Sequence, residues 1–204
     1  GYAYEWNEQQ TEGTLLTSAK QIDTPVSHYF PSPAECMECH TEAAQEVLGL
    51  DTLQLNYTLY YTDGSQENYL DALYRLGYLF SAPLPEHKAD RLYGINDSSA
   101  SLEQKARSYL HSNCSGCHRT GAPQGGYGDM RYNSALTATL NLCGVQAQLG
   151  GNFLIDPGNA VNSMVYRRLA STGASKMPPV GRETADPIAV QVMGDWINSL
   201  SACD

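Results

Sequence analysis

One short cysteine pattern occurs twice in this chain of 204 residues. In each copy, two residues separate a pair of cysteines and a histidine follows the pair. The copies are Cys36-Met37-Glu38-Cys39-His40 and Cys114-Ser115-Gly116-Cys117-His118. The chain holds only five histidines. Because histidine is so scarce, its presence after both pairs indicates that the thiols and the imidazole act together.

The C-x-x-C-H pattern is typical of covalent c-type haem attachment. Two thiols at this spacing can reach the two vinyl groups on one porphyrin edge, and the next imidazole then faces the iron. Its second ring nitrogen normally donates to an acceptor that orients the ring. We therefore expect two haems c, each with two attachment cysteines and one histidine ligand: Cys36, Cys39 and His40 for haem 1, and Cys114, Cys117 and His118 for haem 2.

Two other uses of paired cysteines fit the chain less well. Zinc ribbons separate their cysteine pairs by about 15–20 residues, whereas Cys39 and Cys114 are much farther apart. A thioredoxin-type C-x-x-C lies in a βαβ unit, and neither flank has that pattern. The repeat therefore favours haem.

The remaining cysteines, Cys143 and Cys203, predict a disulfide. Haem attachment at such motifs takes place outside the cytoplasm, where disulfides persist, so we expect a periplasmic or extracellular protein. Closing a loop of about 60 residues would stabilise the fold by roughly 3–4 kcal/mol. The alternative is two buried free thiols.

The sequence predicts a mainly α protein with long irregular loops. Residues 1–33 read as an extended, irregular arm, residues 34–98 as the first haem-binding region, and residues 99–204 as the second haem domain. Gly, Pro and Asn residues make 81–100 a linker between the two haem regions.

Helices are most clearly predicted in the second half. Ser101 and Gln104 fit a capping box at the start of a helix that runs into Cys114. Asp186 is an N-cap with Pro187 in the first turn. The helix that follows carries an apolar stripe at helical spacing, Ile188, Val192, Met193, Trp196, Ile197 and Leu200. We expect these two helices to pack together over the haem, with a shorter helix near 162–169.

The first half gives weaker signals. A helix is expected over 42–48 and another over 65–76, with Ser65 as N-cap and Gly77 as its end. Alternation over 53–59 suggests a strand.

A methionine between the two C-terminal helices is the expected sixth ligand of haem 2. Met177 precedes Pro178 and Pro179, which hold the loop extended and outside any helix. Such a loop can present the thioether to iron from the side opposite His118, and His/Met ligation raises the reduction potential.

These features in this order resemble a class I-type cytochrome c domain over residues 101–204. The resemblance implies His118 and Met177 as axial ligands. More loosely, the whole chain resembles bacterial dihaem c-type cytochromes in which an N-terminal haem motif precedes such a domain. The residues that carry this wider likeness are Ala34-Glu35-Cys36, Gln54-Leu55-Asn56 and Ala106-Arg107-Ser108-Tyr109-Leu110.

The sixth ligand of haem 1 is left open by the sequence. Methionine is absent between Met37 and Met130, and Met37 lies inside the attachment loop. His87 and His28 are the candidates, and an open or water-bound position is the alternative. His111 reads as a surface or inter-haem residue.

Charge limits the partners. The formal net charge is −10, which argues against nucleic acid and favours a basic or neutral docking face on a redox partner. No stretch is long and apolar enough to span a membrane. We expect electron transfer through the two haems. The alternatives are a peroxidase-like enzyme with an open haem 1, or a subunit of a multi-chain extracellular electron conduit, including one formed by homo-assembly.

Overall fold

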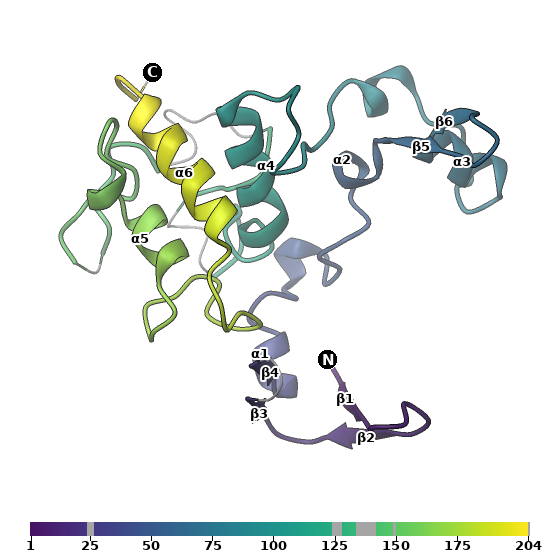
Figure 1. The fold of residues 1–204 in the computed structure, drawn as a ribbon, viewed down its shortest axis with the longest axis horizontal. Helices are drawn as coiled ribbons and strands as arrows, with labels where there is room; N and C mark the ends of the chain where they lie inside the picture. The colour runs from purple at the N-terminus through teal and green to yellow at the C-terminus, as the bar shows by residue number, and fades with distance from the viewer. Residues whose placement is uncertain (24–26, 124–127, 134–141, 149, 204) are drawn as a thin grey trace.

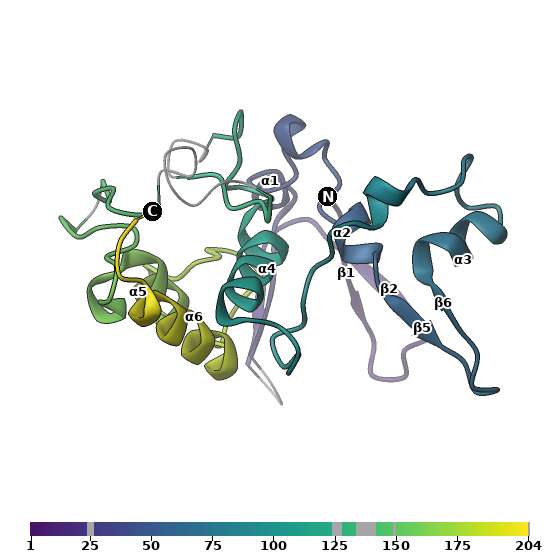
Figure 2. The same ribbon diagram turned by 90° about the horizontal axis from the view of Figure 1, so that it is seen from above.

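A computed structural model describes residues 1–23, 27–123, 128–133, 142–148 and 150–203. Three helices form its core: α4 (Leu102–Cys114), α5 (Met164–Ala170) and α6 (Pro187–Ser199). Three short β-hairpins and the smaller helices lie outside this core (Figure 1; Figure 2). The C-terminal half thus provides the packed scaffold.

Helices α4 and α6 begin at the caps that the sequence predicts. The Ser101 hydroxyl accepts from the backbone N–H of Gln104, and the Gln104 side chain accepts from the N–H of Ser101. At α6, the Asp186 carboxylate accepts from the N–H groups of Ile188 and Ala189. Each cap satisfies backbone N–H groups in the first helical turn that lack an intrahelical partner. These caps therefore set the residues at which α4 and α6 begin.

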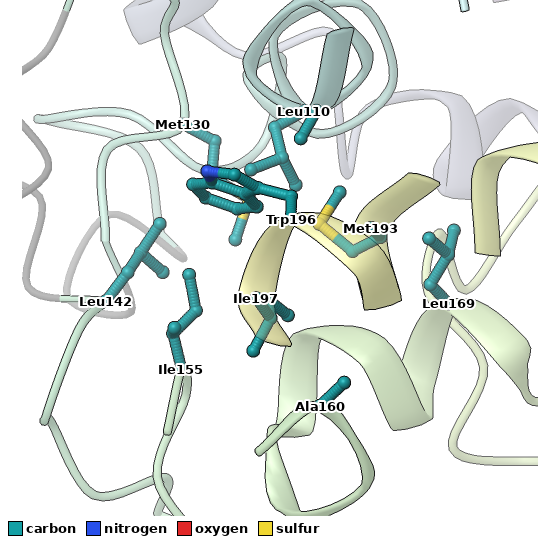
Figure 3. Packing of buried hydrophobic residues seen from close by; sticks show 10 residues of the cluster. Leu110, Met130, Leu142, Ile155, Ala160, Leu169, Met193, Trp196 and Ile197 are labelled. Carbon is teal, nitrogen blue, oxygen red and sulfur yellow. The ribbon is translucent and has the colours of Figure 1, made fainter. Parts of the chain in front are cut away.

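The core is centred on α6, which packs against α4 and α5 (Figure 3). Trp196 is 1% exposed, and burying a side chain of this size stabilises the fold by about 2–3 kcal/mol. The predicted stripe is wrong at one end, because Ile188 is exposed and Ala189 is buried instead. The buried cluster comprises Ala106, Leu110, Met130, Leu142, Ile155, Ala160, Leu169, Met193, Trp196 and Ile197.

The N-terminal residues form two hairpins rather than an irregular arm. Strand β1 (Ala3–Trp6) pairs antiparallel with β2 (Gly13–Leu16), and β3 (Lys20–Ile22) pairs with β4 (His28–Phe30). An ion pair joins the two hairpins, with Lys20 Nζ 2.6 Å from the Glu5 carboxylate.

Residues 34–98, which the sequence predicts to be the first haem-binding region, consist of short elements. They are α1 (Pro33–Cys36), the 3₁₀ helix η1 (Glu42–Ala44), α2 (Thr52–Leu55), β5 (Thr58–Tyr60), β6 (Gln66–Asn68), α3 (Tyr69–Arg75) and η2 (Pro85–Lys88). Strands β5 and β6 pair antiparallel. Buried Asn56 ties this region together, since it donates to the carbonyl of Asp90 and accepts from Asn68.

Several local predictions in this region are wrong. The helix expected over 42–48 is a single 3₁₀ turn that ends at Gln45 in the left-handed region. The strand expected over 53–59 is helix α2 followed by β5. The helix expected from Ser65 is capped by Asn68 instead. Each segment is too short for its periodicity to separate helix from strand.

The fold class predicted from the sequence is also wrong. In the described part of the chain, helices account for 31% of the residues and strands for 13%, so the protein is not mainly α. The hairpins are responsible, because strands of three or four residues leave almost no alternating pattern to recognise. A further 3₁₀ turn, η4 (Ala160–Asn162), precedes α5, which begins two residues later than expected.

Candidate haem-binding site

A cavity of about 390 Å³ lies beside the helical core. It is in the size range of cofactor pockets, and such pockets are mostly apolar with a few polar groups at fixed positions. It brings together the second cysteine motif, the methionine loop and helices α4 and α5. The lining residues are Cys39, Tyr109, Leu110, Asn113, Cys114, Cys117, His118, Met130, Ala147, Gln148, Leu154, Met164, Val165, Arg168, Leu169, Met177, Pro178 and Pro179.

The second motif follows directly from the end of α4. Cys114 is the last helical residue, and its carbonyl accepts from the N–H groups of Cys117 (3.1 Å) and His118 (2.8 Å). This tight turn places both thiols and the imidazole on the cavity wall. Burial raises the pKa of the Cys114 thiol to about 12, because an apolar environment disfavours the thiolate.

The loop after His118 is held by a buried carboxylate. Asp129 accepts from the N–H and hydroxyl of Thr120, and the N–H of Met130 donates to the His118 carbonyl at 2.9 Å. Burial acts to raise the pKa of Asp129, but hydrogen bonds from Arg131 and neighbouring backbone lower it well below its usual value. The carboxylate therefore stays ionised and fixes the chain on both sides of the loop.

Met177 reaches the same cavity from a loop anchored to α5. Its N–H donates to the carbonyl of Arg168 at 3.0 Å. Arg182 donates to the carbonyls of Leu169 and Ser171 at the end of α5. An ion pair between Lys176 and Glu183, at 2.8 Å, closes the loop. These contacts hold Met177, Pro178 and Pro179 at the cavity.

The first motif is built on α1, which ends at Cys36. Ser32 and Glu35 form a reciprocal capping box, and Tyr29 on β4 donates to Glu35 at 2.6 Å. His40 follows, with its Nδ1 2.7 Å from the carbonyl of Glu46. That bond requires a proton on Nδ1 and leaves the Nε2 lone pair available, which is the tautomer an iron ligand needs.

The two motifs contact each other. The Cys117 Sγ donates to the carbonyl of Glu38 at 3.4 Å, and Cys39 lines the cavity that holds the second motif. The neighbouring Cys117 thiol lowers the pKa of Cys39, and the Cys39 thiol together with burial raises the pKa of Cys117. No motif or spacing in the sequence predicts this contact.

His87 and His28 have local contacts. The Nδ1 of His87 accepts from the N–H of Leu84 at 3.2 Å. The exposed His28 ring lies edge-on to Phe30, with ring centroids 4.6 Å apart. The choice between them as a ligand of haem 1 stays a prediction.

His111 is buried, 6% exposed, so the surface alternative is wrong, whereas an inter-haem position stays a prediction. Its Nδ1 accepts from the N–H of Tyr132 at 3.0 Å, and its Nε2 is 3.1 Å from the Asp51 carboxylate. The bond from His111 lowers the pKa of Asp51.

In the part of the chain that the structure describes, these cysteines do not come together as the ligands of a zinc ion would. Among the residues that the structure describes, no three His, Cys, Asp or Glu side chains converge as a metal site would require. A structural zinc ion takes four such ligands. The residues at the cavity fit a group that is bonded through two thiols and ligated by one histidine and one methionine.

Cys143 and Cys203 lie at disulfide distance, with their sulfurs 2.11 Å apart. The pair links the segment next to the buried Leu142 to the C-terminal end.

No protein-family model, curated protein or solved structure matches this chain. Within the described ranges, no helix combines the length and apolar character needed to cross a bilayer.

Proposed function

We propose that the protein is a dihaem c-type cytochrome that transfers electrons outside the cytoplasm. One observation carries the proposal: Cys114, Cys117, His118 and Met177 line a single cavity, although Met177 is far from the motif in sequence. The four side chains are the set needed to bond a porphyrin at two vinyl positions and to ligate its iron on two sides.

The haem would supply the one-electron chemistry, and the protein supplies binding and environment. Cys114 and Cys117 would hold the macrocycle, with His118 and Met177 as axial ligands. Leu110, Leu154, Val165 and Leu169 give the cavity apolar walls. Such walls exclude water and favour the less charged, reduced state, as a soft thioether ligand also does.

The support at the first motif is the orientation of His40. A hydrogen bond to the Glu46 carbonyl holds the ring by Nδ1, so Nε2 can serve as ligand. Cys36 and Cys39 would provide the attachment.

Optical and EPR spectra of the exported, haem-loaded protein test the proposal. We expect two low-spin haems per chain, with a His/Met signature at haem 2. A high-spin haem 1 that reacts rapidly with peroxide would instead favour an enzyme, and protein without covalent haem would overturn the proposal altogether.

A further inference from the structure

The two attachment motifs meet at one place in the structure, and the contact is made by residues far apart in sequence. Glu38 and Cys39 lie against Cys117: the carbonyl of Glu38 accepts from the Cys117 Sγ at 3.4 Å, and Cys39 and Cys117 line the same cavity. Cys39 and Cys117 are the second cysteines of their motifs, so corresponding attachment points face each other.

A short segment after the first motif maintains this contact. The side chain of Leu48 packs on Gly116 inside the second motif, where an added Cβ would lie 3.0 Å from Leu48 Cδ2. Arg119 donates to the carbonyls of Ser115 (2.5 Å) and Ala43 (3.5 Å). Gly121 lies beside Ala43 in the left-handed region, with φ of +88°. Segment 38–51 is thus docked along 111–121.

The docking ends in a charged hydrogen bond. Asp51 reaches the buried His111 one turn before Cys114 on α4. Contacts therefore lie on both sides of the Cys39–Cys117 pair. Together they fix the distance between the two cysteine motifs.

We propose that Cys39 and Cys117 form the centre of a junction through which an electron passes between the two haems of one chain. This inference rests on the proposed function. The step moves one electron from Fe(II) at one motif to Fe(III) at the other. No bond forms or breaks, and no other reactant is consumed. Segment 38–51 is the positioning element, because its docking sets the separation of the two attachment points.

Soret circular dichroism of the haem-loaded full chain tests the junction. Two haems held close together couple their strong Soret transitions and give a bisignate band. We expect the wild-type spectrum to exceed the sum of two single-haem references, Cys36→Ser/Cys39→Ser and Cys114→Ser/Cys117→Ser. A wild-type spectrum equal to that sum, from protein with two haems per chain, would overturn the junction and leave the proposed function intact.

A matched pair of variants tests the positioning role. Leu48→Arg places a charge against Gly116 and should reduce the bisignate band. Leu50→Arg adds the same charge two residues away, where the side chain is 80% exposed, and should leave the band unchanged. Equal bands in both variants would contradict the role of the Leu48 contact.

A kinetic measurement on the wild type stands even if the single-haem references fail to fold. After pulse reduction of a fraction of the haems, we expect a phase of electron exchange whose rate is independent of protein concentration. Exchange that occurs only at a rate proportional to concentration would mean that electrons pass between chains, and would overturn the proposal.

Discussion

The Nε2 of His111 on α4 lies 3.1 Å from a carboxylate oxygen of Asp51, the N-cap of α2, although 60 residues separate them in sequence. His111 is buried, and Asp51 is also the N-cap that accepts from Leu53. The pair connects residues 34–98 to helix α4, which leads into the second cysteine motif. Neither residue belongs to a recognisable motif.

Removing the Asp51 carboxylate should weaken this attachment. We expect Asp51→Ala to lower the free energy of unfolding by about 1–3 kcal/mol, since it removes an N-cap and leaves a buried imidazole donor without its partner. Asp71→Ala is the control, because Asp71 forms a more exposed ion pair with Lys88 worth about 0–1 kcal/mol. Urea unfolding measures both. Equal losses in the two variants would count against the role of the pair.

The same pair predicts a pH dependence. The bond from His111 lowers the pKa of Asp51 in the folded state, so its contribution is complete above the unfolded pKa of about 3.9. The contribution is lost as the pH falls through the folded pKa. The stability gap between wild type and Asp51→Asn should therefore stay constant down to about pH 4 and narrow as the pH falls from there toward about pH 2. A gap that stays constant over this lower range would contradict the assignment.

Met177→Ala should leave the iron of haem 2 without its sixth protein ligand. Loss of the thioether leaves the sixth position to water or an added ligand, so the variant should become partly high-spin and bind cyanide. Met164→Ala is a matched control, since Met164 lines the same cavity but lies at the start of α5 rather than in the Met-Pro-Pro loop. An unchanged low-spin spectrum in Met177→Ala would remove this residue as the ligand.

The sequence analysis selected the cysteines, the histidine and the methionine that line the cavity. It did not predict the segment that packs against the second cysteine motif. The capping box at Ser101, the Asp186 cap and the Met177 loop are local patterns, and each appears where the sequence places it. The docking of segment 38–51 depends on contacts among Leu48, Gly116 and Arg119 that no periodicity or spacing encodes.

The first region shows the same limit. Its caps at Asn68 and Thr41 are single polar residues among many, and its strands span three residues each. Tertiary contacts, such as those of buried Asn56 with Asp90 and Asn68, decide between competing local conformations there.

The remaining cysteine pair gives a prediction about thiols. With four cysteines in thioethers and Cys143 bonded to Cys203, denatured but unreduced protein should contain no free thiol. Replacing Cys143 and Cys203 by serine should lower the free energy of unfolding by about 2–5 kcal/mol, measured by thermal or urea unfolding of the holoprotein. Two titratable thiols in the unreduced protein would contradict the disulfide.

Charge should govern encounter with a redox partner. With a formal net charge of −10, electron transfer to a basic acceptor protein should slow as ionic strength rises, because salt screens the attraction. Stopped-flow rates at several salt concentrations measure this. A small neutral oxidant is the control and should show little salt dependence. A salt-independent rate with the basic protein would contradict electrostatic steering of the partner. It would leave the proposal of two covalent haems untouched.

The most direct test of the account is the haem content of the denatured protein. Intact mass together with a pyridine haemochrome assay should show two haems bonded covalently to each chain, and peptide mapping should place them at Cys36/Cys39 and Cys114/Cys117. A mass equal to that of the polypeptide alone, with no haemochrome band, would contradict it.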